Sequence, residues 1–476
     1  MENIRSVSDT NQSEIQKIFK AQQQRQYDIG RSIAAERIVK LKRFHQAITD
    51  YTSEIRQALY DDLRKHPSET DLTEIYCITG EIKHAIRHLK KWMKPKRVAT
   101  PIALLGTGSY IHYEPKGVVL IIAPWNFPLN LTFGPLVSAI AAGNCAMVKP
   151  SELTPHTSHI MNKMIESLFS QDEVALVEGG VDTSQGLLKL PFNHIFFTGP
   201  SAIGKIVMEA ASKHLASVTL ELGGKSPTIV DETASVSTAA RRIAWGKFIN
   251  NGQTCIAPDY LFVHNKIKNA FTERLQKNLE EFYSAEPEKS ESYCRMVNNR
   301  HFNRVKSYVD EAVSDGAKII SGGVYKNDQN YIAPSLLTDV KPDSALMQEE
   351  IFGPVLPINF YEDLNEPLHV IRCREIPLAL YIYSNSRKNI KQIIQNTRAG
   401  GTVINHSVIH FYQNNLPFGG SNNSGIGKSH GFFGFQAFSN ARGIMKQVLP
   451  FSGIDLMMPP YTDMKKKLID LTIKWF

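Results

Sequence analysis

The sequence predicts an α/β fold with a doubly wound parallel sheet, a second α/β domain and a small β ribbon, and two patterns support this class. After residue 117, short apolar runs alternate with amphipathic segments, as expected of strands buried on both faces and of the helices that cover them. Before residue 95, apolar residues recur at three- and four-residue steps, which indicates helices. The chain therefore begins with helices and continues as strand–helix units.

Three strands are expected at 117–123, 145–148 and 194–198, and helices follow them at about 133–142, 157–169 and 202–214. Ligands of such folds bind at the carboxyl ends of the strands. The loops 124–128, 149–152 and 198–204 are therefore candidate cofactor or substrate positions. The alternation restarts at 227–230, 260–263 and 378–383, which predicts the second α/β domain.

The amino-acid composition excludes several classes of protein. The 476 residues are 42% hydrophobic and 21% charged, which excludes wholesale disorder. Five scattered cysteines without a CxxC pair exclude a disulfide framework and a zinc ribbon. The polar N-terminus and the lack of an apolar run of about 20 residues predict no signal peptide and no membrane span. We expect a cytoplasmic protein with reduced thiols.

The formal net charge of +8 raises the question of an anionic partner. The densest basic run, residues 87–97, is interpreted as a solvated helix end, because no nucleic-acid-binding motif accompanies it. We expect no nucleic-acid partner.

The loop from Gly199 to Lys205 resembles a phosphate loop, but Ile206 stands where magnesium binding requires Ser or Thr. Its glycine spacing also differs from G-x-G-x-x-G. A strand, a tight turn and a helix start still present backbone N–H groups to an anion. A phosphate-bearing cofactor and an ordinary strand–helix turn both remain open at this point.

Two side chains are candidates for chemistry. Cys255 lies among small and polar residues, so it is either a buried spacer or a nucleophile. Glu221 ends an apolar strand, where a carboxylate is either a general base or half of a salt bridge. The pairs His84/His88 and His406/His410 lack a third ligand, so no metal site is predicted.

Seven ordered motifs resemble the aldehyde dehydrogenase superfamily over roughly residues 20–450, and the interval between Glu221 and Cys255 also matches. The similarity is to its class 3 and fatty-aldehyde branch, through Cys255-Ile-Ala-Pro-Asp-Tyr260, the segment 423–431 and the tail Pro459-Pro-Tyr461-Thr-Asp. The seven motifs are Pro-Trp-Asn126-Phe-Pro, Lys149-Pro-Ser-Glu152, Phe-Thr-Gly199-Pro-Ser-Ala-Ile-Gly204, Leu-Glu221-Leu-Gly-Gly-Lys-Ser-Pro, Asn-Asn-Gly-Gln-Thr-Cys255, Glu349-Glu350-Ile-Phe352-Gly-Pro and Leu-Pro-Phe418-Gly-Gly.

The resemblance implies an enzyme that oxidises hydrophobic aldehydes, aliphatic of medium or long chain or aromatic, to carboxylic acids with NAD(P)+. Cys255 would be the nucleophile, forming a thiohemiacetal and then a thioester. The Asn126 amide and the Cys255 backbone N–H would form the oxyanion hole, and Glu221 would activate the hydrolytic water. Two alternatives stay open: an acylating, coenzyme A-dependent dehydrogenase, and an inactive binding protein on the same scaffold. The physiological aldehyde is not identified.

The resemblance also implies a cofactor site. Lys149 and Glu152 would bind the adenosine ribose, Gly199 and Ser201 would meet the pyrophosphate, and Glu350 would hold the nicotinamide ribose. NAD is expected, with NADP as the alternative, because Glu152 would repel a 2′-phosphate that Lys149 attracts. Pro200 removes one backbone donor from the loop. The full expected set is Trp125, Lys149, Glu152, Thr198, Gly199, Ser201, Gly204, Leu222, Glu350 and Phe352.

The resemblance implies an NAD(P)-binding domain (1–97 and 117–222), a catalytic domain (223–418) and an oligomerisation ribbon of a homodimer (98–116 and 434–449), followed by a tail (450–476). The tail predicts an amphipathic helix over 464–476 with a basic polar face. It would pack on its own subunit or a dimer mate, cap the substrate tunnel, or make peripheral contact with a membrane. The apolar face is Met464, Leu468, Leu471 and Trp475, with Ile469, Ile473 and Phe476 beside it.

Overall fold

The first part of the chain is helical, as the periodicity predicts. The computed structural model describes residues 9–475, so the predictions for residues 1–8 and for Phe476 lie outside the described residues. The Asn11 side chain accepts a hydrogen bond from the Ser13 backbone N–H and so caps the first helix. These helices are α1 (Gln12–Gly30), α2 (Ala34–Asp50), α3 (Thr52–Leu63), α4 (Pro67–Thr70) and α5 (Tyr76–Trp92), with a π-helical turn (Asp71–Ile75) before α5.

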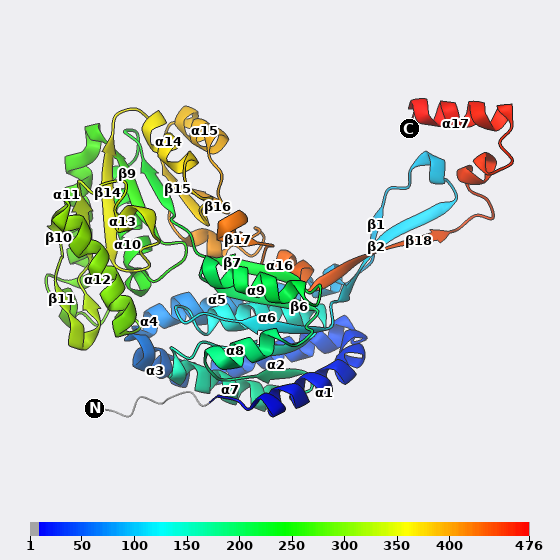
Figure 1. Cartoon of the computed structure of the whole chain (residues 1–476), viewed down its shortest axis with the longest axis horizontal. Helices are drawn as coiled ribbons and strands as arrows, with labels where there is room; N and C mark the ends of the chain where they lie inside the picture. The colour runs from blue at the N-terminus through cyan, green and yellow to red at the C-terminus, as the bar shows by residue number, and fades with distance from the viewer. Residues whose placement is uncertain (1–8, 476) are drawn as a thin grey trace.

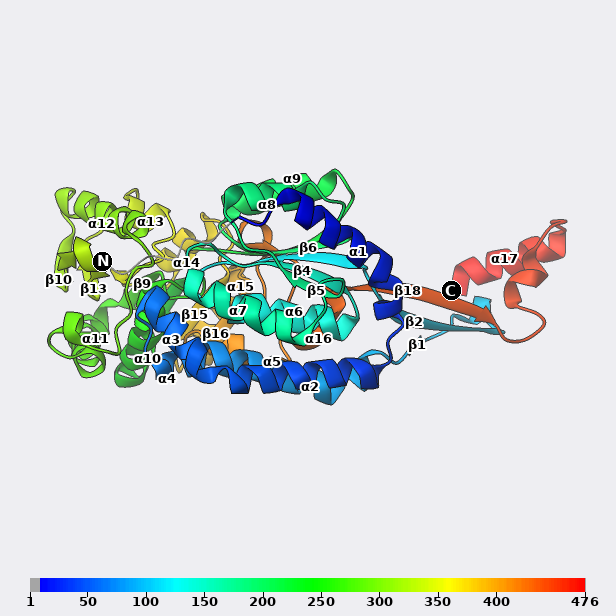
Figure 2. The same cartoon turned by 90° about the horizontal axis from the view of Figure 1, so that it is seen from below.

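The first sheet has six strands in the order β17-β7-β6-β3-β4-β5. All neighbouring pairs are parallel except β17, which is antiparallel to β7. Helices cover both faces, with α1, α8 and α9 on one side and α2, α5, α6 and α7 on the other (Figures 1 and 2). The strands are β3 (Val118–Ile122), β4 (Cys145–Lys149), β5 (Val174–Leu176), β6 (His194–Gly199), β7 (Ser217–Leu222) and β17 (Gly425–Ile426), and the connecting helices are α6 (Asn130–Ala142), α7 (Pro155–Leu168), α8 (Val181–Leu188) and α9 (Ser201–Ser212).

The second sheet has seven strands in the order β10-β13-β14-β9-β8-β15-β16. The three strands expected after residue 223 are present as β8, β9 and β15, whereas the sequence analysis did not identify the other four. The strands are β8 (Pro227–Val230), β9 (Tyr260–His264), β10 (Lys318–Ser321), β13 (Ser335–Thr338), β14 (Val355–Tyr361), β15 (Ala379–Tyr383) and β16 (Gly401–Ile404), flanked by α10 (Val236–Phe248), α11 (Lys268–Tyr283), α12 (Asn299–Ser314), α13 (Ala345–Gln348), α14 (Asn365–Arg372) and α15 (Arg387–Asn396).

A three-stranded antiparallel ribbon projects from the two units, with β2 in its centre (Figure 1). It consists of β1 (Lys96–Val98), β2 (Thr107–Pro115) and β18 (Ser439–Gln447). Residues 434–437, expected in the ribbon, instead belong to α16 (Gly431–Ala437). A Cβ at Gly434 would lie 2.3 Å from Ser138 Oγ of α6, so the absence of a side chain allows α16 to pack on the first unit.

The tail forms α17 (Asp463–Trp475), as its amphipathic pattern predicts. This helix stands at the far end of the ribbon, away from both units (Figures 1 and 2). It contacts the short helical segment Gly453–Met457, and Met464, Ile473 and Trp475 remain largely exposed. Of the three alternatives for the tail, capping of the tunnel by the same chain is therefore not seen among residues 9–475. Over residues 9–475, no helix is long and apolar enough to cross a membrane.

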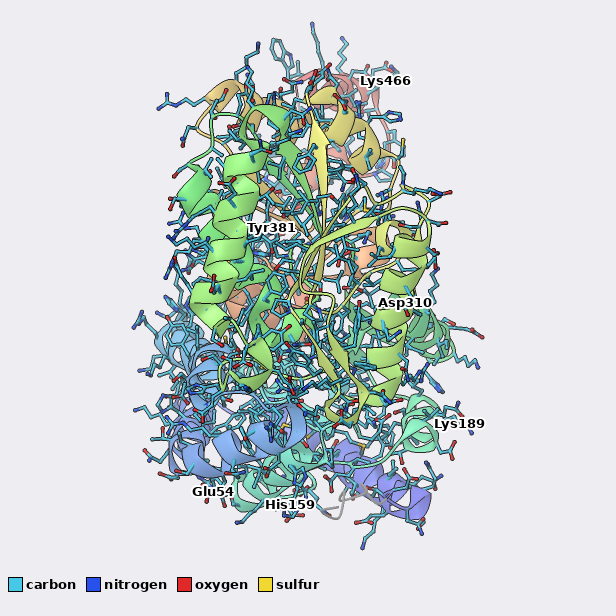
Figure 3. All side chains as sticks on the ribbon, turned by 90° about the vertical axis from the view of Figure 1, so that its left-hand side faces the viewer. Glu54, His159, Lys189, Asp310, Tyr381 and Lys466 are labelled. Carbon is cyan, nitrogen blue, oxygen red and sulfur yellow. The ribbon has the colours of Figure 1, made fainter. Side chains whose placement is uncertain are left out.

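The interior of the second unit is densely filled by side chains. In Figure 3, Tyr381 of β15 is labelled in this interior, whereas Glu54, His159 and Lys189 lie at the periphery. Tyr381 is fully buried, and its hydroxyl donates to the backbone carbonyl of Ile256, directly after Cys255. The core of the second unit thus supports the segment that bears the candidate nucleophile.

Candidate active site

A cavity of about 380 Å³ lies where both units contribute side chains, at the carboxyl ends of β3, β6 and β7. Its walls are mainly apolar. Lys149, Glu152, Ser201 and Gly204 do not line it. The expected site residues in its wall are Trp125, Asn126, Thr198, Gly199, Glu221, Leu222, Cys255, Glu350 and Phe352.

The loop before Cys255 has an unusual backbone that its sequence permits. Asn250, Asn251 and Gly252 have φ values of 52°, 57° and 70°, all in the left-handed region. Asparagine and glycine tolerate this region better than other residues. A Cβ at Gly252 would also lie 2.3 Å from the Gly353 carbonyl oxygen. The Asn-Asn-Gly sequence is thus needed to turn the chain into Cys255.

Buried amides fix this loop in place. Asn251 Nδ2 donates to the Cys294 carbonyl at 3.0 Å. Gln253 Nε2 donates to the Arg295 carbonyl at 3.0 Å, and its Oε1 accepts from the Val297 N–H at 2.9 Å. These amide side chains are fully buried, so each hydrogen bond is costly to lose. The position of Cys255 is therefore set by the packed interior rather than by a mobile loop.

Cys255 is half-buried and lines the cavity. Burial raises the pKa of this thiol well above its usual range, and the neighbouring Glu350 and Glu221 carboxyls raise it further. In the free protein the thiol is therefore protonated at neutral pH. A bound cation would favour the thiolate, which is the reactive form.

Asn126 follows β3 and is only 3% exposed. Its Nδ2 donates to the Gln253 carbonyl at 3.0 Å, which uses one of the two N–H bonds of the amide. Its backbone carbonyl accepts from Asn250 Nδ2 at 2.8 Å and from Lys65 Nζ at 3.4 Å. The second amide N–H of Asn126 is the group that can reach a ligand in the cavity.

Glu221 is 6% exposed and lies near the end of β7. Its Oε1 accepts from Ser429 Oγ at 2.8 Å, and its Oε2 has no hydrogen-bond partner among the described residues. Burial raises the pKa of Glu221 to about 8, while Ser429 and Lys428 oppose this shift. A carboxyl with a pKa near 8 can exchange a proton at physiological pH, as a general base must.

Glu350 lies against the turn at Gly223. A Cβ on Gly223 would be 2.1 Å from Glu350 Oε2, so only glycine accommodates this carboxyl. Burial raises the pKa of Glu350 to about 8, and Asp259 raises it further. The Arg304 guanidinium donates to the carbonyls of Glu350 at 3.2 Å and Ile351 at 2.9 Å. This clamp holds the Glu350 segment at the cavity.

Aromatic rings close one side of the cavity. Phe352 has φ 45°, an uncommon value for a bulky residue, and its ring meets Trp125 edge-on at 5.3 Å between centroids. The His301 ring lies 4.9 Å from Trp125 on the other side. Burial lowers the pKa of His301 to about 4, so this ring is neutral. The three rings lie at steep angles to one another and form an uncharged aromatic wall on this side of the cavity.

The expected phosphate loop forms a strand–turn–helix, with β6 ending at Gly199 and α9 beginning at Ser201. Ser201 Oγ donates to the Asn423 carbonyl at 2.8 Å, so this hydroxyl is already engaged. A Cβ on Gly204 would lie 2.6 Å from Leu222, which shows that Gly204 allows α9 to approach β7. The N–H groups of Ile203 and Gly204 donate to the Pro200 carbonyl at 3.0 Å, which leaves those of Ser201 and Ala202 for an anion.

Lys149, the last residue of β4, forms an ion pair of 3.0 Å with Glu152 in the loop that follows. The Lys149 side chain is 4% exposed and that of Glu152 is 39% exposed. Together they offer a donor and an acceptor for neighbouring hydroxyl groups. With the free N–H groups of α9 and the Glu350 carboxyl, this donor set fits a dinucleotide laid across the ends of the strands.

Several cavity residues were not found from the sequence. Ser429 and His430 lie within the segment 423–431, which contributed only to the resemblance. Glu81 and Arg304 sit on helices far from any motif. The only sequence indication for Ser429 and His430 was the glycine-rich pattern that precedes them.

The histidine pairs are packed rather than arranged for a metal. His84 and His88 contact each other at 4.3 Å between centroids, and His410 lies 5.6 Å from Phe418. Within residues 9–475 no cluster of three or more His, Cys, Asp or Glu side chains could hold a metal ion.

The fold and the cavity define a two-unit α/β protein with a mainly apolar cavity at the carboxyl ends of its parallel strands. The chain belongs to the aldehyde dehydrogenase family, whose model matches residues 1–444. It is an NAD(P)-dependent aldehyde dehydrogenase, and its substrate is an aldehyde. The family and the class 3 branch predicted from the motifs are thereby confirmed.

Two relatives and one solved structure illustrate the similarity. The chain is 45% identical to the 4,4'-diaponeurosporen-aldehyde dehydrogenase of Staphylococcus aureus, over 89% of this chain and 91% of the relative. It is 43% identical to the dimeric NADP-preferring aldehyde dehydrogenase of Rattus norvegicus, over 89% and 93%. The structure of Staphylococcus aureus AldH in its substrate-bound state has a TM-score of 0.92 at 42% identity, covering 96% of this chain and 99% of that one.

Proposed function

We propose that Cys255 attacks the carbonyl carbon of a hydrophobic aldehyde. The observation that supports this role is that the half-buried Cys255 lines one cavity together with Asn126, Glu221 and Glu350. The attack converts the trigonal carbon into a tetrahedral thiohemiacetal and places negative charge on the former carbonyl oxygen.

The second amide N–H of Asn126 and the backbone N–H of Cys255 would stabilise that oxyanion. Asn126 is suited to this task because its backbone carbonyl is fixed by Asn250 and Lys65, so the amide is preorganised. Loss of one such donor typically costs about 3–4 kcal/mol of transition-state stabilisation.

Bound NAD(P)+ would supply the acceptor for the hydride that the thiohemiacetal carbon loses, which leaves a thioester on Cys255. Lys149 and Glu152 would hold the adenosine ribose, Gly199, Ser201 and the start of α9 the pyrophosphate, and Glu350 the nicotinamide ribose. Trp125, Thr198, Gly204, Leu222 and Phe352 would shape the site around the cofactor. NAD is the preferred cofactor in this proposal, because Glu152 places a negative charge beside Lys149.

Glu221 would take a proton from a water molecule as that water attacks the thioester. The carboxylic acid then leaves, and the Cys255 thiol is restored. Glu221 is buried and has a pKa of about 8, so it can act as a base toward water at physiological pH. This favours hydrolysis of the thioester over transfer of the acyl group to coenzyme A. Product analysis with and without coenzyme A distinguishes the two, and an acyl-coenzyme A product would support the acylating alternative.

The cavity walls favour apolar substrates. The non-polar part of the wall includes Leu131, Pro135, Phe196, Phe411 and Phe418. Each added CH₂ group that becomes buried contributes about 0.8 kcal/mol, or about fourfold in kcat/KM. We therefore expect kcat/KM to rise along a series of straight-chain aldehydes until the cavity is filled. The name of the staphylococcal relative, which specifies a 4,4'-diaponeurosporen-aldehyde, agrees with an apolar substrate.

The direct test compares Cys255→Ala with Cys373→Ala, because Cys373 is exposed and distant from the cavity. Cys255→Ala should abolish NADH formation from an aldehyde while NAD+ binding, measured calorimetrically, persists. Cys373→Ala should retain full activity. Turnover by Cys255→Ala would contradict the assignment.

The ribbon would form a homodimer interface. β18 is an edge strand of the ribbon, and Met445 on it is 57% exposed. An exposed edge strand presents unpaired backbone N–H and C=O groups that can pair with a strand of another chain. Light scattering should give twice the monomer mass for the parent protein, and Met445→Glu should shift the mass toward the monomer.

A second copy would also cover the apolar face of α17, where Leu471, Ile473 and Trp475 are exposed. Truncation after Pro460 should then weaken the dimer. Loss of binding to vesicles containing anionic lipid, without a change of dimer stability, would instead support peripheral membrane contact by this helix.

A further inference from the structure

The backbone of Ser429 is fixed independently of its side chain. Phe418 and Ser429 form a two-way bridge, with the Ser429 N–H donating to the Phe418 carbonyl at 2.7 Å and the Phe418 N–H donating back at 3.3 Å. The side chain is therefore free to serve another group. It is buried, and its Oγ lies 2.8 Å from Glu221 Oε1.

The hydroxyl has one proton and two acceptors within reach. The nearer is Glu221 Oε1 at 2.8 Å, and the farther is the Phe418 carbonyl at 3.4 Å. When Glu221 is a carboxylate, the hydroxyl donates to it. When Oε1 carries a proton, the same hydroxyl oxygen can accept it and turn its own proton to the Phe418 carbonyl. One side chain can thus satisfy Glu221 in both protonation states.

We infer that Ser429 is a positioning residue for the general base: its hydroxyl keeps the Glu221 carboxyl in place before and after that carboxyl takes a proton from water. This inference rests on the proposed role of Glu221. A base that gains and loses a proton in every turnover needs a partner that can both donate and accept, which an ammonium or a backbone N–H cannot do.

Other groups around Glu221 do not duplicate this contact. The Lys428 ammonium donates to the carbonyls of Gly419 and Gly420, and it acts on Glu221 only through its charge. A Cβ on Gly419 would lie 3.1 Å from Glu221 Oε1, so the backbone packs closely there. From the nucleophile loop, the Cys255 thiol faces the same carboxyl. Ser429 is the direct hydrogen-bond donor among these described groups.

Removing the hydroxyl has a predictable electrostatic result. The hydrogen bond from Ser429 favours the charged form of Glu221 and opposes the effect of burial on its pKa. Ser429→Ala should therefore make the carboxylate harder to form, so that hydrolysis of the thioester requires a higher pH. A charge-assisted hydrogen bond corresponds to a shift of about one pH unit, or about tenfold in rate below the midpoint.

The test separates formation of the thioester from its hydrolysis. The NADH burst reports formation, and quenched-flow mass spectrometry of the Cys255 adduct reports decay as a function of pH. Ser429→Ala should retain the NADH burst and shift the midpoint of the pH profile of adduct decay upward by about one pH unit. Ser429→Thr, which keeps a hydroxyl, should restore the parental midpoint. Ser439→Ala is the matched control, since this buried serine donates only to the Phe435 carbonyl, at 2.6 Å.

The inference would be overturned if the pH midpoint of adduct decay in Ser429→Ala equalled that of the parent protein, or if Ser439→Ala shifted it equally. The proposed role of Glu221 has its own test, because Glu221→Gln should block decay of the adduct. If Glu221→Gln blocks decay while Ser429→Ala behaves like the parent, only the positioning role fails. If Glu221→Gln leaves decay unchanged, the base lies elsewhere, and the role of Ser429 fails with it.

Discussion

Lys65 Nζ lies 3.1 Å from Glu74 Oε1, and neither side chain has any solvent exposure. The pair sits beneath the loop of Asn126: Lys65 also donates to the Asn126 carbonyl, and Glu74 Oε2 accepts from the Asn130 N–H at 2.7 Å. The Lys65 ammonium lies 4.5 Å from the centre of the Phe127 ring. A buried ion pair thus supports the backbone of the expected oxyanion hole.

Breaking this pair should destabilise the protein strongly. Lys65→Met leaves Glu74 buried without its cation, which typically costs about 3–5 kcal/mol. The double variant Lys65→Met/Glu74→Gln should recover most of that loss. Denaturant titration measures both losses of stability, and Lys289→Met is the control, because Lys289 and Glu286 form an exposed pair that contributes little to stability. Equal effects of Lys65→Met and Lys289→Met would contradict the assigned importance of the buried pair.

Glu152 should determine the choice between NAD and NADP. Its carboxylate neutralises Lys149 at 3.0 Å and would repel a 2′-phosphate. Glu152→Gln should lower the KM for NADP+ by about tenfold, which corresponds to about 1.4 kcal/mol, with a smaller change for NAD+. Steady-state kinetics with both cofactors measure this. Glu166→Gln, an exposed change on α7, should alter neither value. If the KM for NADP+ is unchanged in Glu152→Gln, another residue determines the choice between NAD+ and NADP+.

Replacement of Gly223 should impair the enzyme, because the Glu350 carboxyl occupies the space that a side chain at position 223 would need. A Cβ there would lie 2.1 Å from Glu350 Oε2, so Gly223→Ala must displace this carboxyl. A displacement of about 1 Å can cost about a hundredfold in rate, so we expect a large loss of kcat/KM for the cofactor. Gly80→Ala on α5, where the nearest atom is 4.0 Å away, should retain normal kinetics. Normal cofactor kinetics in Gly223→Ala would show that Glu350 does not hold the cofactor.

The pH dependence of hydrolysis should follow Glu221. Its pKa is about 8 because of burial, and only the carboxylate can accept a proton. Decay of the thioester should therefore accelerate as pH rises from 7 to 9. Glu350 also has a pKa of about 8 and could cause the same pH dependence. The pH profile of thioester decay is therefore measured in Glu350→Gln as well, where its midpoint should be unchanged. A profile that is flat over this range would contradict Glu221 as the base.

The same pKa shift has a consequence for stability. The folded-state pKa of Glu221 lies above its ordinary value of 4.5, so the folded state binds this proton more tightly than the unfolded state. Its contribution to stability is present below about pH 4.5 and is lost as pH rises through about 8. Glu221→Gln should thus raise Tm relative to the parent at pH 9 but not at pH 4. An equal Tm difference at both pH values would contradict the shifted pKa.

Local patterns predicted much of the first sheet and the loops at its strand ends. Thr198 and Gly199 could be placed because a buried strand, a turn and a helix follow each other directly. The contact between Ser429 and Glu221 could not be predicted from the sequence, because 208 residues separate them and no periodic pattern links them. β14 was missed because Pro357 lies within it, and proline ordinarily argues against a central strand. Long-range packing, rather than local preference, completes the site.

The central claim is that the Cys255 sulfur bonds covalently to the substrate during turnover. The most direct measurement is peptide mass spectrometry of Glu221→Gln after incubation with NAD+ and a straight-chain aldehyde. The account predicts an adduct on the peptide that contains Cys255, heavier by the mass of the aldehyde less two hydrogen atoms. NADH formation by the parent enzyme with no adduct on Cys255 in this variant, or an adduct on another cysteine, would contradict it.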